Sequence, residues 1–218
     1  MFFWEERPRT RGPKPALTLD QIAGAAIAVA DAEGLPAVSM QRVAAELGFT
    51  KMSLYRYVPG KTELVAVMLE RALGGPPGDL SDLSWRDALS AWASSLLERY
   101  EAHRWALEAT AGARPIGPNE LAWMESALTV LPAGLTGAER MDAVATIAGQ
   151  VRMIAGQSGT AESELTATIG LVLREHADRF PALTAAVTDA AARGGQDQAF
   201  RFGIERILDG MEVLIQRR

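Results

Sequence analysis

Residues 39–65 read SMQRVAAELGFTKMSLYRYVPGKTELV, and this stretch decides the fold. Ser39 is a good N-cap for a helix of about two turns, which ends at Gly48, a residue that tolerates the positive φ of a tight turn. Thr50 is placed to cap another short helix, which runs to about Tyr57 and stops before a Pro-Gly pair. A helix, a glycine turn and a second helix form the arrangement that presents a short helix to the major groove of DNA.

The second helix of this stretch has an unusual surface for a core element. Once Leu54 and Val58 face inward, its other positions carry mostly cations, hydroxyls and phenols, which are partners for phosphates and base edges. The alternative is a solvated surface helix with two unconnected tyrosines. The outward positions are Lys51, Met52, Ser53, Tyr55, Arg56 and Tyr57.

Helices are expected on both sides of this stretch. Residues 18–33 place an apolar stripe on one helical face, and Gly34 suits the left-handed position after the helix end. Residues 61–73 predict a further helix that buries Leu64 and Met68. The stripe of the first helix consists of Ile22, Ala26, Val29 and Ala30.

The rest of the chain also predicts helices, because β-branched alternation is absent and Ala, Leu, Glu and Arg dominate. The Gly-Gly-Pro-Pro-Gly run at 74–78 is the strongest break, and we place the domain boundary there. The predicted fold is all-α, with an N-terminal three-helix helix-turn-helix domain (18–74) and a larger C-terminal helical domain (79–218). Residues 1–17, rich in Arg and Pro, are interpreted as a flexible basic arm. Further helices are expected at about 84–103, 119–131, 136–156, 161–180, 181–192 and 197–216.

The charge of the chain is unevenly distributed. The 218 residues carry a net charge of −5, which by itself argues against a nucleic-acid partner. Residues 1–61, however, hold eight Lys and Arg against six acids, a balance of +2, which leaves −7 for the remainder. A mildly basic head on an acidic body is compatible with DNA binding, although many soluble proteins show similar unevenness.

Composition also limits the compartment and the chemistry. The chain contains no cysteine, which excludes disulfides and thiolate metal sites. No apolar run approaches the roughly 18 residues that cross a bilayer, and the start of the chain holds no signal-peptide segment. We therefore expect a cytoplasmic protein that has no membrane partner.

The 39–65 stretch resembles the DNA-binding segment of the tetracycline-repressor (TetR) family of bacterial regulators. The resemblance extends over residues 18–74 without a gap and is far more specific than a helix-turn-helix pattern alone. It is carried by the turn glycine Gly48, the Leu54-Tyr55 pair, Tyr57 followed by an apolar Val58, and Lys61 at the start of the next helix.

Family membership implies a role for each outward residue. Base edges are expected to be read by Gln41, Lys51, Met52 and Ser53. Phosphates are expected to be held by Thr50, Tyr55, Tyr57 and Lys61. Arg42 and Arg56 complete the expected set, although Arg56 points either to DNA or to solvent.

These roles are chemically reasonable. Lys51 can donate to guanine, Gln41 can pair with adenine, and Met52 can lie against a thymine methyl group. The arm cations could enter the minor groove, or the arm could be a disordered basic leader, and both interpretations stay open. The arm cations are Arg7, Arg9, Arg11 and Lys14.

The resemblance also implies a homodimer through helices at about 136–157 and 197–216. Two half-sites related by a two-fold axis supply the base pairs that one short helix cannot read alone. The last helix carries an apolar stripe that includes Ile204, Leu208 and Met211, which plain core packing would also explain.

The C-terminal region resembles tetracycline-repressor-like effector domains more loosely. A small-molecule pocket is expected there, and plain core packing of the aromatic residues is the alternative. In the tetracycline repressor, a histidine and a carboxylate help to bind the magnesium-tetracycline complex. The resemblance implies that Thr110 stands in the place of this histidine and Gln157 in the place of this carboxylate. We therefore expect no metal, no cofactor, and a small apolar or aromatic effector. The expected pocket residues are Trp92, Leu96, Tyr100, Thr110, Arg114, Trp123, Met153 and Gln157.

The function expected from these patterns is a repressor that binds a palindromic operator in double-stranded DNA and is released by its effector. An activator, or a regulator without an inducer, could use the same parts. An enzyme is not expected, because no HExxH, GxSxG or phosphate-loop pattern occurs, and His103 and His176 lie in ordinary helical settings. A helical scaffold would leave the outward surface of residues 51–57 unexplained.

Overall fold

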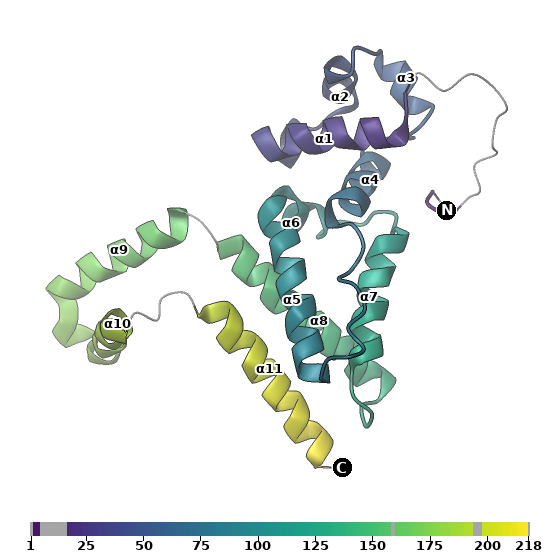
Figure 1. Cartoon of the computed structure of the whole chain (residues 1–218). Helices are drawn as coiled ribbons and strands as arrows, with labels where there is room; N and C mark the ends of the chain where they lie inside the picture. Colours follow the sequence, from purple (N-terminus) through teal and green to yellow (C-terminus); the bar gives the residue numbers. More distant parts are fainter. Residues whose placement is uncertain (1, 5–16, 158–159, 194–197, 218) are drawn as a thin grey trace. The chain divides into compact units, whose positions relative to one another are not determined.

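A computed structural model describes residues 2–4, 17–157, 160–193 and 198–217. Throughout these ranges the regular elements are helices, which confirms the all-α prediction (Figure 1). The contacts within the chain group into two units, residues 1–132 and residues 133–218, and each unit is described by itself. In the described ranges, no helix combines the length and apolar character needed to span a membrane.

The first unit begins with α1 (Leu19–Glu33), followed by a 3₁₀ turn η1 (Leu35–Ala37), α2 (Met40–Glu46) and α3 (Lys51–Tyr55). A capping box opens α1: the Thr18 hydroxyl accepts from the Gln21 backbone N–H, and the Gln21 side chain accepts from the Thr18 backbone N–H. The predicted apolar stripe of α1 is buried, as expected.

The turn between α2 and α3 satisfies the end of α2 with backbone groups alone. Gly48 has a φ of 71°, a conformation that favours glycine. Its N–H donates to the Ala45 carbonyl, and the Phe49 N–H donates to the Ala44 carbonyl, which together form a Schellman motif. The predicted turn glycine is therefore confirmed, and the motif sets the direction in which α3 leaves the turn.

Helix α4 (Lys61–Leu73) lies between α1 on one side and the later helices of this unit on the other (Figure 1). It contacts α1, α5 (Trp85–Ala102), α6 (Trp105–Ala109) and α7 (Pro118–Val130). Leu64 and Met68 are fully buried, as predicted. Helix α6 was not predicted, because five residues are too short for an apolar period to show.

The two contact units do not divide at the predicted domain boundary, which stays a prediction. The glycine-proline run at 74–78 does end α4, and Gly74 has a φ of 58°. However, α4 packs on α5, α6 and α7 as well as on α1, so residues up to 132 form one unit. A break in helical periodicity marks the end of an element, but it does not show which elements pack together.

The second unit contains α8 (Gly137–Gln157), α9 (Thr160–His176), η2 (Ala177–Arg179), α10 (Pro181–Arg193) and α11 (Ala199–Gln216). Helices α8 and α11 pack together, and a Cβ on Gly203 would overlap the Gln150 side chain, so glycine permits this approach. Helix α9 ends four residues earlier than the predicted Phe180, where η2 begins. The buried residues of α8 and α11 are Ala143, Val144, Ile147, Val151, Ala155, Ile204, Leu208 and Met211.

Candidate nucleic-acid interface

Two apolar residues fix the orientation of α3. Leu54 and Val58 are both 0% exposed, as predicted. Their burial turns the opposite face of α3 outward, where Met52 is 66% exposed and Tyr55 is 43% exposed. Met52 and Tyr55 therefore lie where a partner could contact them.

Most of the other expected DNA contacts also lie at the surface. Gln41 on α2, Lys51 and Arg56 at the two ends of α3, and Lys61 at the first position of α4 are exposed. Tyr57 is half-buried in the turn that follows α3. The Gly48 turn and the buried Leu54 and Val58 thus turn amide, ammonium, guanidinium and phenol groups outward. We call the exposed face formed by Gln41 and residues 51–57 the α2–α3 surface.

Thr50 stands at the N-cap of α3, as predicted, but its hydroxyl makes no capping bond to the helix backbone. Instead, Thr50 Oγ1 lies 3.1 Å from Ser53 Oγ. The hydroxyl pair therefore leaves the N–H groups of the first turn of α3 without a side-chain cap.

Arg42 differs from the other expected contacts because its guanidinium is already paired. Its two terminal nitrogens lie 2.7 Å from carboxylate oxygens of Glu33 and Glu46. The hydrogen bond and the charge of Glu33, followed by the charge of Glu46, raise the pKa of Arg42. Arg42 joins the start of α2 to the end of α1, so a DNA contact would require it to release at least one carboxylate.

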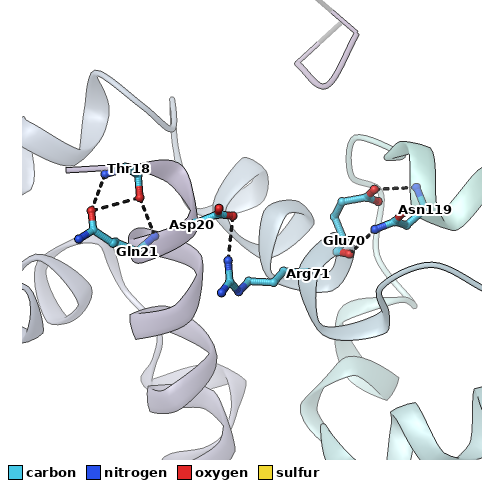
Figure 2. A network of polar contacts seen from close by, with 6 residues as sticks. All are labelled: Thr18, Asp20, Gln21, Glu70, Arg71 and Asn119. Carbon is cyan, nitrogen blue, oxygen red and sulfur yellow. Dashed lines mark hydrogen bonds and ion pairs between the residues drawn. The ribbon is translucent and has the colours of Figure 1, made fainter. Parts of the chain in front are cut away.

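We call helices α1, α2 and α3 together the DNA-reading head. Polar contacts that the sequence analysis did not identify join this head to α4 and to the later helices. Asp31 Oδ1 on α1 accepts a hydrogen bond from Trp105 Nε1 at 2.7 Å and lies 2.9 Å from His103 Nδ1. Figure 2 shows two further contacts, in which Asp20 pairs with Arg71 and Glu70 binds Asn119. Partners more than 45 residues apart leave no periodic signal in the sequence.

Two of the expected effector residues form a core pair. The Trp92 and Trp123 rings meet edge to face, with centroids 5.6 Å apart. Trp92 Nε1 donates to the Trp123 carbonyl at 2.9 Å, and Trp123 Nε1 donates to the Gly74 carbonyl at 3.0 Å. Both indole N–H groups are therefore satisfied inside the protein, which agrees with the packing alternative for these two side chains.

The remaining effector candidates are spread over both units. Leu96 and Tyr100 are buried on α5, and the Thr110 hydroxyl donates to carbonyls of its own helix. Arg114, whose side chain is only 6% exposed, pairs with Glu120 at 2.8 Å. Met153 and Gln157 are exposed residues of α8, in the second unit. An effector site formed from this set stays a prediction.

Two cavities of the structure lie elsewhere. One of about 450 Å³ lies between residues 78–83 and the second half of α7. A second, of about 340 Å³, lies between α8 and α11. Neither is lined by the expected effector residues. In the described part of the chain, no three His, Asp or Glu side chains gather as they would around a metal ion.

Two family models match the chain. Residues 17–68 match the bacterial regulatory proteins of the tetR family, and residues 77–215 match the tetracyclin repressor-like C-terminal domain. Together they span the head and almost all of the remaining chain.

Individual relatives agree with these matches. The HTH-type transcriptional repressor DrrR1 of Streptomyces coeruleorubidus is 41% identical over 99% of this chain and 85% of its own length. Apo ActR of Streptomyces coelicolor superimposes with a TM-score of 0.76 at 26% identity, over 94% of this chain and 99% of ActR. Mycobacterium smegmatis BioQ, solved with its DNA operator, shares the fold at 20% identity and a TM-score of 0.60, over 89% and 97% of the two chains.

Proposed function

Because the chain belongs to the TetR family of bacterial regulatory proteins, we propose that it is a dimeric repressor released from a palindromic operator by a small molecule. As a member of this family it is a helix-turn-helix regulator of transcription. The repressing direction is supported by DrrR1, a repressor with 41% identity over nearly the full chain. The dimer, the operator symmetry and the effector are the parts that need a test.

The observation that carries DNA binding is the α2–α3 surface. Leu54 and Val58 anchor α3 from below, and its outward side chains have the chemistry that base edges and phosphates require. In this proposal Gln41, Lys51, Met52 and Ser53 read bases. The phosphate backbone is held by Thr50, Tyr55, Tyr57 and Lys61.

The dimer is supported by the apolar residues that α8 and α11 leave uncovered. Beside their buried seam, both helices expose large apolar side chains, which soluble monomers rarely display in groups. The groove between them is lined by Ile207, Met211 and Leu214 and edged by charges of both signs. A second copy of the chain would bury this face and bring two reading helices to one operator. The exposed residues are Met141, Met153, Phe202, Val213 and Leu214.

The effector class is proposed from composition and from ActR. The first unit is rich in aromatic residues, Trp92, Tyr100, Trp105 and Trp123, although all four are buried in its core. ActR has been solved with actinorhodin, at 27% identity to this chain and a TM-score of 0.71 over 90% of it and 95% of ActR. We propose an aromatic small molecule as the effector and actinorhodin as a first probe. Effector and operator binding would then weaken each other by the same factor.

The site assignment is tested by a double substitution. The operator is first obtained by in vitro selection from random duplex DNA with the wild-type protein. Lys51→Ala combined with Tyr55→Ala should lower its affinity by at least about a hundredfold, because a base contact and a phosphate contact are lost in each subunit. Arg99→Ala, which removes an exposed charge from α5, is the control and should bind as wild type does. Wild-type affinity in the double variant, with the dimer intact by analytical ultracentrifugation, would overturn the assignment.

A further inference from the structure

We propose that Glu70 and Asn119 position the DNA-reading head, because their mutual contact holds the end of α4 against the start of α7. The inference rests on the proposed DNA-binding function and adds the residues that set the placement of the head. All of the groups involved lie in the first unit of the chain.

The contact is reciprocal. Glu70 Oε1 accepts a hydrogen bond from the Asn119 backbone N–H at 2.6 Å, and the Glu120 backbone N–H also donates to this carboxylate. In return, Asn119 Nδ2 donates to the Glu70 carbonyl at 2.9 Å. The first turn of a helix leaves N–H groups unpaired and the last turn leaves carbonyls unpaired. Each of the two side chains thus satisfies an end group of the other helix (Figure 2).

The N-cap residue of α7 agrees with this interpretation. That position is Gly117, which has no side chain with which to cap the helix. A Cβ added there would overlap the Glu70 carboxylate. The glycine therefore leaves room for a cap supplied by α4, and a negative charge at this end of α7 is favoured by the helix dipole.

The two sides of α4 are held in different ways. Towards α1, α4 packs over an extended area, and the ion pair of Arg71 with Asp20 at 2.8 Å is exposed and contributes little. Towards the start of α7, the reciprocal hydrogen bonds between Glu70 and Asn119 add a directional contact to the packing of α4 on α7. Apolar packing tolerates small shifts of its atoms, whereas a cap is lost when donor and acceptor separate by about 1 Å.

The cap is also only moderately favourable. Burial raises the pKa of Glu70, hydrogen bonds from Asn119 and Glu120 oppose this shift, and the charge of Glu120 adds to it. Glu120 itself is paired with Arg114 at 2.8 Å. While the Glu70–Asn119 contact holds, a displacement of α7 would pass to α4 and, through the α1–α4 packing, to α2 and α3.

The test uses three substitutions that break the same contact from different sides: Glu70→Gln, Asn119→Ala and Gly117→Ala. Glu125→Gln, which removes an exposed carboxylate from α7, is the matched control. Operator affinity is measured on the selected duplex for the full-length dimer. A head that samples several positions binds in proportion to the population of the competent one. We therefore expect affinity to fall on the order of tenfold in Asn119→Ala and Gly117→Ala, less in Glu70→Gln, and not at all in the control.

A second readout separates placement from stability. The chain has no cysteine, so Ala45→Cys on the exposed side of α2 gives one spin-label site per subunit. Pulsed electron spin resonance on the DNA-free dimer measures the distance between the two labels. This distance should be broader or shifted in the Glu70, Asn119 and Gly117 variants. The Lys51/Tyr55 double variant should lose operator binding while keeping the wild-type distance.

The outcomes distinguish the two proposals. If the wild-type protein selects no duplex, the proposed function fails. If the wild-type protein binds DNA but the Glu70, Asn119 and Gly117 variants keep wild-type affinity and label distance, the proposed positioning role of Glu70 and Asn119 is wrong. Reduced affinity with an unchanged distance, accompanied by a lower thermal midpoint, would also overturn it, because that result describes a structural role alone. Gly117→Ala alters neither hydrogen-bonding residue, so it remains informative if Asn119→Ala folds poorly.

Discussion

Helix α3 and helix α7 direct their side chains in opposite ways. On α3, one residue of the helix is fully buried, and the outward groups include an ammonium, a methionine and a phenol. On α7, Trp123 is buried against Trp92 and uses its N–H on a carbonyl at the end of α4. Side chains that stabilise this fold are therefore largely separate from those available to a partner. Substitutions at the outward positions of α3 should change binding, and a substitution at the buried Trp123 of α7 should change stability.

The largest expected effect comes from Trp123→Ala. The change removes the edge-to-face partner of Trp92, leaves a cavity and deprives the Gly74 carbonyl of its donor. We expect the free energy of unfolding to fall by about 3–5 kcal/mol, measured by urea unfolding at fixed protein concentration. Leu121→Ala, an exposed apolar residue of the same helix, is the control and should change it by less than about 0.5 kcal/mol. If Trp123→Ala lowered the free energy of unfolding by less than about 1 kcal/mol, the proposed difference between α7 and α3 would be wrong.

A smaller effect, on operator affinity and not on stability, is expected from Met52→Ala. Because this side chain is largely exposed, the free energy of unfolding should change by less than about 0.5 kcal/mol. Operator affinity should fall by up to about tenfold, and only for duplexes that carry thymine at the contacted position. Fluorescence anisotropy with thymine and uracil versions of the selected duplex measures this, since uracil lacks the methyl group. Equal losses on both duplexes would show that Met52 does not read that methyl.

The smallest effect is a pH dependence at the α4–α7 contact. The pKa of Glu70 is raised by burial above the ordinary value of 4.5, so the folded state holds this proton more tightly than the unfolded state does. The stability of wild type relative to Glu70→Gln should therefore rise as pH falls through the folded pKa, and level off below 4.5. Urea unfolding of both proteins between about pH 7 and pH 4 measures the difference. A difference that shrinks as pH falls would show that the hydrogen bonds outweigh burial.

Local patterns in the sequence predicted local structure well. The α1 stripe, the Gly48 turn, and the inward Leu54 and Val58 are all confirmed. Each depends on residues within two helical turns of one another, where periodicity and glycine chemistry act directly. The same nearness explains why the exposed face of α3 was predicted together with its anchors.

Predictions of which side chains are available to a ligand were less complete. Arg42 was expected at DNA, and its guanidinium is paired with Glu33 and Glu46. Trp92 and Trp123 were expected in a pocket, and their N–H groups are bonded within the core. Whether a charged or aromatic side chain is available to a ligand depends on neighbours that the chain brings together only when it folds.

The sequence by itself determined the helical class, the turn that separates α2 from α3, and the residues that α3 turns outward. It did so because helix caps, positive-φ glycines and apolar periods are set by neighbouring residues. Only the tertiary structure decided which elements α4 joins, and only there does Glu70 meet Asn119 over the space left by Gly117. Such contacts depend on how helices pack, since hydrogen bonds between helix ends need donors and acceptors aligned within tenths of an ångström. The surface proposed to bind DNA can thus be recognised in residues 39–65. The Glu70–Asn119 contact, which we propose positions this surface, can be seen only in the folded chain.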